Sequence, residues 1–315
     1  MGAVPIDVSQ VSKTFGNFRA VDDLSFQVYA GEIFAMLGPN GAGKSTTIRM
    51  ILDILKPDTG RISVLGGTVD MERKQRIGYL PEERGLYTDI AVLDVMTYLG
   101  RLKGMKGQAA RDRAMQLLEQ LELAEHAKKK VSELSKGMQQ KVQFAVTVLH
   151  NPDLIIIDEP FSGLDPVNRL VIKGLLIEFR DRGGAIVMST HQMNQVEEMA
   201  DRMLMISHGQ QKLYGPVEEI RERYAKHALI VEGQGDWSRL PGVERVEQVG
   251  NGRGGRNGAM MLHLASQATN DSILAAIAED KGITIERFER AVPSLDEIFI
   301  QVAGESAHIS QKVEA

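Results

Sequence analysis

The sequence of 315 residues contains no cysteine. This absence excludes a disulfide framework, a thiolate zinc site and a thiol nucleophile, and it fits a reducing compartment. The sequence also lacks a long apolar run. Its longest stretch without a charged residue, from Gly183 to Val196, includes Ser, Thr, His, Gln and Asn and falls short of the ~20 apolar residues that a membrane span needs. We therefore expect no transmembrane helix.

The sequence has no excess of positive charge, since 37 basic and 42 acidic side chains give a formal charge of −5. This balance does not favour binding a polyanion by counterion release, so general nucleic-acid binding is not expected. The first residues have no basic n-region, and Ile6 stands where a myristoylation signal requires Ser or Thr. No export signal or lipid anchor is predicted.

Short β-branched runs alternate with longer stretches of helical period from Ile6 to about Tyr214. This alternation predicts an α/β domain over residues 1–216, with parallel strands covered by helices. Three runs are apolar nearly throughout and are expected to form the central strands: Ile33–Leu37, Leu154–Asp158 and Ala185–Thr190. Between them, amphipathic helices over 94–105 and 111–126 predict a helical subdomain at about 85–150.

A second, smaller unit is expected after a charged linker helix at 217–225. Residues 226–303 are predicted to form a small α+β domain with strands at 228–232, 243–249, 260–265 and 283–288, and a helix at 269–280. Pro293, Ser294 and Glu297 form a capping-box pattern for a last helix. The segment 250–258, GNGRGGRNG, is interpreted as a hairpin loop in preference to an RNA-binding segment, and 304–315 as a flexible tail.

A phosphate-binding loop is the strongest motif of the sequence. The pattern G-x-x-x-x-G-K-[ST] lies between an expected strand and an expected helix, and its residues are Gly38, Pro39, Asn40, Gly41, Ala42, Gly43, Lys44, Ser45 and Thr46. The backbone N–H groups of such a loop surround a polyphosphate, while Lys44 neutralises its oxygens and Ser45 can ligate Mg²⁺. A chance Gly-rich turn would explain neither the strand before the loop nor the helix after it.

Two consecutive carboxylates, Asp158 and Glu159, end the buried run LIIID. Open α/β sheets bind their ligands at this end of the strands. Asp158 suits the water shell of Mg²⁺, and Glu159 suits a general base that orients water towards a γ-phosphate. A helix-capping role would be the simpler interpretation if the phosphate loop were absent.

With these motifs in place, residues 6 to about 214 resemble the ATP-binding subunits of ABC transporters. Leu134, Ser135, Lys136, Gly137 and Met138 stand at the signature position, where Lys136 and Met138 replace glycine and glutamine. The resemblance implies that Ser135 and Gly137 bind a γ-phosphate, that Asp165 belongs to the D-loop and that His191 is the switch histidine. It also implies that Phe15 stacks on adenine and that Glu82 replaces the glutamine of the Q-loop near the metal.

The resemblance implies a P-loop NTPase of ABC type that uses ATP and Mg²⁺. Because each motif occurs once, the functional form is expected to be a homodimer, or a heterodimer with a homologous ATPase. The expected partner is a polytopic membrane permease, which would hold the chain on the cytoplasmic face of the membrane. Export is favoured by likeness to an exporter subgroup with a C-terminal domain ending in P-S-L-D-E-x-F, here Pro293 to Phe299.

Two alternatives stay open, a non-transport ABC ATPase that acts on nucleic acid or ribosomes, and a P-loop phosphotransferase. The first would carry a long coiled coil or a second cassette, and this sequence has neither pattern. The second leaves the signature, D-loop and switch histidine unexplained. The transported substrate cannot be deduced from the sequence.

Overall fold

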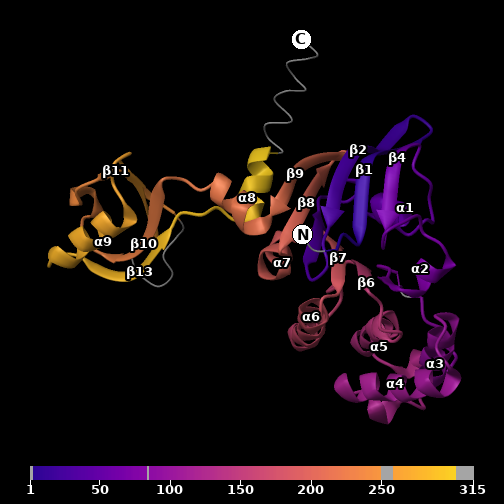
Figure 1. Ribbon diagram of the computed structural model, residues 1–315. Coiled ribbons are helices and arrows are strands. Elements are labelled where there is room, and N and C mark those ends of the chain that lie inside the picture. Colours follow the sequence, from indigo (N-terminus) through magenta and orange to yellow (C-terminus); the bar gives the residue numbers. More distant parts are fainter. Residues whose placement is uncertain (1–2, 84, 250–257, 303–315) are drawn as a thin grey trace. The chain divides into compact units, whose positions relative to one another are not determined.

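A computed structural model describes residues 3–83, 85–249 and 258–302, and the chain divides into two compact units, Met1–Val217 and Glu218–Ala315. Figure 1 shows both units, and each is described by itself. The expected tail at 304–315 lies outside the described residues, and so does the expected loop at 250–258 apart from Gly258.

A six-stranded sheet forms the centre of the larger unit, in the order β5-β6-β7-β3-β8-β9. The three strands expected at its centre are confirmed with their full bounds, as β3 (Ile33–Leu37), β6 (Leu154–Asp158) and β7 (Ala185–Thr190), and every residue in them is buried. The other strands are β5 (Ile77–Leu80), β8 (Arg202–Ser207) and β9 (Gln210–Pro216). Only β9 runs antiparallel to its neighbour, so the carboxyl ends of five strands meet at one edge.

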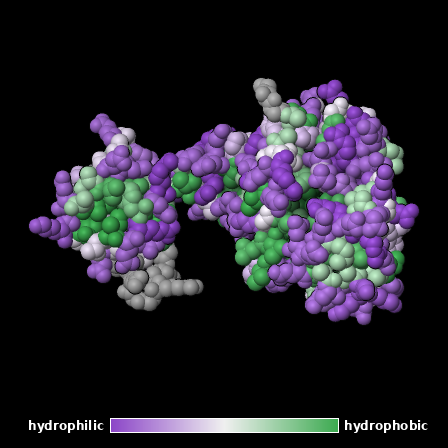
Figure 2. All heavy atoms as spheres, turned by 60° about the horizontal axis from the view of Figure 1, so that its bottom comes forward, coloured by the Kyte–Doolittle hydropathy of each residue, from purple (hydrophilic) through white to green (hydrophobic). Residues whose placement is uncertain are grey.

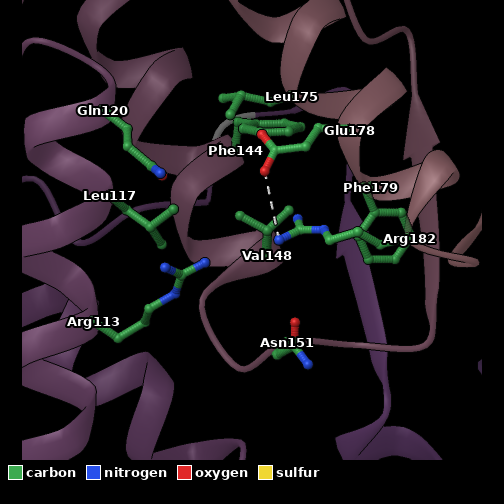
Figure 3. Close-up of a pocket in the computed structure, with 10 residues that line it drawn as sticks. All are labelled: Arg113, Leu117, Gln120, Phe144, Val148, Asn151, Leu175, Glu178, Phe179 and Arg182. Atoms are coloured by element: carbon green, nitrogen blue, oxygen red, sulfur yellow. Dashed lines mark ion pairs between the residues drawn. The ribbon is translucent and has the colours of Figure 1, made fainter.

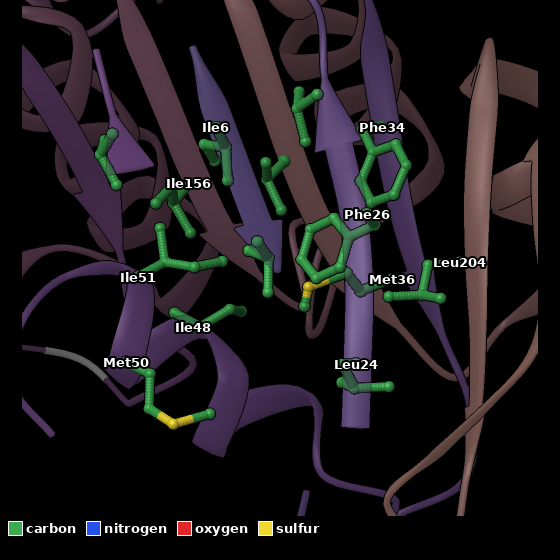
Figure 4. Close-up of a cluster of buried hydrophobic side chains, with 14 of the residues drawn as sticks. Ile6, Leu24, Phe26, Phe34, Met36, Ile48, Met50, Ile51, Ile156 and Leu204 are labelled. Carbon is green, nitrogen blue, oxygen red and sulfur yellow. The ribbon is translucent and has the colours of Figure 1, made fainter. Parts of the chain in front are cut away.

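A second sheet, which the sequence analysis did not anticipate, has the antiparallel order β2-β1-β4. Its strands are β1 (Ile6–Phe15), β2 (Phe18–Val28) and β4 (Thr59–Val64). Side chains of both sheets and of α1 (Lys44–Ile51) pack into one core, seen in Figure 4, where Phe26 and Phe34 stack with ring centroids 5.5 Å apart. This core holds the strand before the phosphate loop and the helix after it.

Helices between β5 and β6 form the expected helical region, but their ends differ from the prediction. α3 (Val92–Leu102) ends before Gly104, which has φ +87°, and α4 (Gly107–Gln120) ends before Glu122, which has φ +59°. The predicted ends at 105 and 126 were wrong because these left-handed residues stop the helices. α5 (Lys136–Val148) then leads into β6, and a short α2 (Met71–Gln75) precedes β5.

After β6 in the sequence, α6 (Pro166–Asp181) links β6 to β7, and α7 (Met193–Met199) links β7 to β8. The helices of these crossovers, visible in Figure 1, pack against the six-stranded sheet, and the second sheet and α1 cover the face that contributes to the shared core. The predicted α/β fold class is confirmed. In the described part of the chain, we find no helix with the length and apolar character needed to span a bilayer.

The smaller unit begins within α8 (Val217–Arg223) and contains an antiparallel sheet in the order β11-β12-β10-β13. Its strands are β10 (Ala228–Gln234), β11 (Val243–Gln248), β12 (Met260–Leu264) and β13 (Thr284–Arg290), and α9 (Asn270–Glu279) packs on them through buried Ile273 and Ile277. The expected α+β character is therefore present. The predicted capping box also forms, since the backbone N–H groups of Ser294 and Glu297 each donate to the other's side chain.

Candidate functional site

The loop from Gly38 to Gly43 lies against its neighbours so closely that a side chain cannot replace either glycine. A Cβ atom on Gly38 would come 2.2 Å from the carbonyl oxygen of Ile206, and one on Gly43 would come 2.5 Å from that of Ala20. α1 begins directly after the loop at Lys44. The loop is thus packed from outside at the amino terminus of a helix, which is the usual geometry of a phosphate cradle.

Lys44 folds back over this loop. Its Nζ donates to the carbonyl oxygens of Gly38 at 2.7 Å and Pro39 at 3.1 Å, and the residue is only 7% exposed. Burial lowers the pKa of the ammonium below its ordinary value, although Glu159, Asp158 and Glu82 act in the opposite direction. Such a desolvated cation gains by binding an anion, and the phosphate oxygens of a nucleotide are suitable partners.

Asp158 ends β6 beside the start of α1. One carboxylate oxygen accepts from the hydroxyl of Ser45 at 3.2 Å, and the other accepts from the hydroxyl of Ser189 on β7. These bonds fix the carboxylate at the end of β6 between β7 and α1. A hydroxyl and a carboxylate in contact offer the oxygen ligands that Mg²⁺ prefers.

Glu159 adopts φ +54°, a left-handed conformation that is rare for a side-chain-bearing residue. Its carboxylate accepts from the backbone N–H of His191 at 3.1 Å and lies 2.6 Å from the ring Nδ1 of the same residue. Because a carboxylate only accepts hydrogen bonds, Nδ1 carries the proton in this contact. The hydroxyl of Thr190 lies 3.3 Å from the second carboxylate oxygen. Glu159 and His191 therefore form a hydrogen-bonded pair.

These groups surround one pocket of about 410 Å³ at the carboxyl edge of the six-stranded sheet. The pocket contains most of the predicted site, namely Asn40, Gly41, Gly43, Lys44, Ser45, Thr46, Glu82, Asp158, Glu159 and His191. Phe18 and Ala20 also line it, and the sequence analysis did not select them. Phe15, predicted to stack on adenine, does not line this pocket. It pairs across the turn with Phe18 and is 47% exposed, with the ammonium of Lys13 5.7 Å from its ring centre.

Ser135, Gly137 and Asp165 lie together outside this pocket. Ser135 caps α5 by accepting from the N–H of Met138 at 3.3 Å, and Asp165 caps α6 by accepting from the N–H of Asn168 at 3.0 Å. That second bond holds the pKa of Asp165 below its ordinary value. A Cβ on Gly137 would lie 3.4 Å from the amide nitrogen of Asn168, so the signature and D-loop segments are neighbours.

Another, smaller cavity of about 70 Å³ lies between α4, α5 and α6 (Figure 3). The apolar side chains of Leu117, Phe144 and Phe179 line it, while Arg182 pairs with Glu178 at 3.6 Å. It shares no lining residue with the pocket at the phosphate loop.

Comparison with known proteins agrees with this geometry. Residues 21–162 match the family described as "ABC transporter", and residues 215–303 match the "ATP-binding protein DrrA1-3-like, C-terminal domain". An ABC transporter ATP-binding protein of Bacillus subtilis, YhaQ, is 40% identical over 95% of this chain and 98% of its own length. The chain belongs to the ABC transporter ATP-binding proteins.

Other relatives of this ABC ATPase are named for export. The "Nod factor export ATP-binding protein I" of Burkholderia lata is 39% identical over 73% of this chain and 74% of its own length. Among solved structures, one titled "Structure of ATP binding subunit of ABC transporter" shares 30% identity with a TM-score of 0.65 over 70% of this chain and 92% of its own. The predicted family and fold are confirmed, and the protein is an ATPase of a family whose ATP-binding subunits work with membrane permease partners.

Proposed function

We propose that this ABC ATPase powers export through a separate membrane permease, from the cytoplasmic face of the membrane. The observation that carries the catalytic part is the Glu159–His191 pair at the edge of the phosphate-loop pocket. Export is supported by the likeness to the Nod factor export ATP-binding proteins. The nature of the exported molecule would be set by the permease.

In this proposal, the triphosphate binds in the cradle made by Gly38, Pro39, Asn40, Gly41, Ala42, Gly43 and the residues that begin α1, Lys44, Ser45 and Thr46. On binding, the ammonium of Lys44 turns from the loop carbonyls to the β- and γ-phosphate oxygens, and bonds to charged acceptors replace bonds to neutral ones. An aromatic ring at Phe15 or Phe18 covers the adenine, since stacking needs only a flat π-face.

Glu159 acts as the general base. His191 holds one carboxylate oxygen with two hydrogen bonds, while the other oxygen has only a long contact with Thr190 and is free to accept a proton from water. The carboxylate thereby orients the water in line with the γ-phosphate. His191 keeps Glu159 in place, because its protonated Nδ1 prevents rotation of the carboxylate.

The residues also fit Mg²⁺. In the described parts of the chain, no three His, Asp or Glu side chains converge as a metal site of their own. The contact between Ser45 and Asp158 instead provides two oxygen ligands beside the cradle, and Mg²⁺ commonly takes the rest from phosphates and water. Glu82 lines the same pocket and adds a third oxygen donor. When bound, the ion would neutralise charge on the transferred phosphoryl group.

The functional unit in this proposal is a dimer with two composite sites. Ser135, Gly137 and Asp165 lie together but do not line the pocket of their own chain, which is expected if they cover the nucleotide of a second subunit. That subunit is a copy of this chain or a homologous ATPase. The smaller unit, proposed to comprise a linker helix at 217–225 and an accessory domain at 226–303, would adjust the lifetime of this dimer.

Purification from membranes tests the proposal. The tagged chain should copurify with a protein of several hydrophobic spans, and inside-out vesicles containing both should accumulate a substrate when ATP is supplied. A Lys44→Ala variant should retain the membrane partner and lose accumulation. Copurification with ribosomes or nucleic acid, without a membrane protein, would reject transport and leave the ATPase assignment intact.

A further inference from the structure

The turn between β8 and β9 touches the phosphate loop from outside. It is a two-residue turn of His208 and Gly209, flanked by the paired residues Ser207 and Gln210. Both turn residues have positive φ, +50° and +74°, which is the type I′ geometry suited to the twist of a hairpin. We call it the His208–Gly209 turn.

Two backbone hydrogen bonds connect this turn to the phosphate loop and to β2. The N–H of Gly209 donates to the carbonyl oxygen of Ala42 at 3.0 Å, and the carbonyl of Gly209 accepts from the N–H of Asp22 at 2.8 Å. Gln210 adds a side-chain bond to Asp22 at 3.0 Å. The turn thus joins the phosphate loop to β2, the strand that supplies Phe18 and Ala20 to the pocket.

The bond to Ala42 determines which way the next peptide N–H points. In a trans peptide, the C=O of Ala42 and the N–H of Gly43 belong to one plane and point in opposite directions. The carbonyl is held outward by Gly209, so the N–H of Gly43 is directed to the opposite side. Gly43 lines the pocket, and that side is the one that a phosphate would occupy.

We propose that Gly209 is a positioning residue for nucleotide binding, acting through Ala42 to aim the Gly43 N–H at the phosphates. The close approach of β2 excludes a side chain at Gly209, because a Cβ atom there would lie 2.9 Å from the carbonyl oxygen of Ala20.

The variant Gly209→Ala in the full chain tests the inference. Its Cβ pushes the turn away from Ala20 and loosens the bond to Ala42, so the Kd and KM for ATP should rise about 10- to 100-fold, the effect of losing one charge-assisted bond. The rate at saturating ATP should stay within about threefold, because Glu159 and His191 are untouched. Gly209→Asn, which tolerates positive φ better, should weaken ATP binding similarly with a smaller loss of thermal stability.

Gly183→Ala is the matched control. Gly183 also has positive φ, +91°, but a Cβ there meets no atom within 4 Å, so this variant experiences backbone strain without a displaced neighbour. It should lose thermal stability and keep its ATP affinity. The inference is rejected if Gly183→Ala weakens ATP binding as much as the Gly209 variants do, or if both Gly209 variants bind ATP like the wild type. If Gly209→Ala does not fold, Gly209→Asn decides alone.

Discussion

Replacing Glu159 with glutamine removes the proposed base without changing the size of the side chain. The amide oxygen can still accept both bonds from His191. The amide NH₂ then faces Thr190, whose hydroxyl lies 3.1 Å from the side-chain oxygen of Gln195 and can donate to it instead. Every polar group therefore keeps a partner, and the folded structure should not change.

The hydrolysis rate should fall by about 10²- to 10⁴-fold, equivalent to roughly 3–5 kcal/mol of barrier, because an amide cannot take the proton of the attacking water. Binding should persist, since the cradle and Lys44 are unaltered. ATP affinity should even increase. Of the three carboxylates that act on Lys44, Glu159 has the largest electrostatic effect, and its negative charge opposes an incoming phosphate. An ATP-bound dimer should then accumulate.

Single-turnover phosphate release and calorimetric ATP binding measure the two quantities separately. Glu178→Gln is the matched control, because Glu178 is exposed and lies outside the pocket, and this variant should hydrolyse ATP normally. Turnover of Glu159→Gln within about threefold of wild type, with an unchanged pH profile, would falsify the assignment of Glu159 as base.

Four further changes test other parts of the molecule. Phe15→Ala should cost about 1–3 kcal/mol of ATP binding and spare inorganic triphosphate, and a larger loss in Phe18→Ala would assign the stacking to Phe18. Glu82→Gln should shift the Mg²⁺ dependence of hydrolysis and spare Mg²⁺-free nucleotide binding; identical Mg²⁺ titrations would remove Glu82 from the metal site. Deletion of residues 218–315 should leave ATP binding intact and alter dimer lifetime, and a folded truncation unable to bind ATP would contradict the proposed division. Burial, with help from Lys103, lowers the pKa of His150 from 6.5 to about 4. Between pH 6.5 and about pH 4, His150 is mostly protonated in the unfolded chain and mostly neutral in the folded chain. The free energy of unfolding should therefore fall by about 2 kcal/mol from pH 7.5 to pH 5. In denaturant titrations His150→Gln should lose this dependence and the exposed His227→Gln should keep it.

The central strands could be predicted from the sequence because their burial is complete. β3, β6 and β7 are covered on both faces, so every position except Asp158 at the end of β6 carries an apolar or small residue. The sheet β2-β1-β4 gave no such signal. In β1, buried and exposed positions do not alternate regularly, since pairing with β2 shifts register three times and Gln10 adopts φ +53°. Bulges of this kind disrupt the period of two on which strand prediction depends.

The residues that line the pocket were predicted where a sequence motif marks them and missed where their position depends on pairing across the fold. The residues from Asn40 to Thr46 follow one another in the chain, so their spacing alone identifies them. Phe18 and Ala20 reach the pocket because β2 lies beside the loop, and Gly209 contacts Ala42 because β8 pairs with β3 at Leu37. Gly209 and Ala42 are more than 150 residues apart in the sequence, so no local pattern predicts their contact.

The backbone at Glu159 explains how two adjacent carboxylates can take different roles. In a regular strand, successive side chains point to opposite faces, so a continued β6 would place Glu159 across the sheet from Asp158. The φ of +54° instead ends the strand, while the N–H of Glu159 still bonds to the carbonyl of Ser189 at 3.0 Å. As a result, Asp158 faces Ser45 and Glu159 faces His191 at the edge of the same pocket. A left-handed residue costs about 1 kcal/mol or more, and the bonds to His191 and Thr190 compensate for it. The strain is thus the local cost of placing the proposed metal ligand and the proposed base side by side.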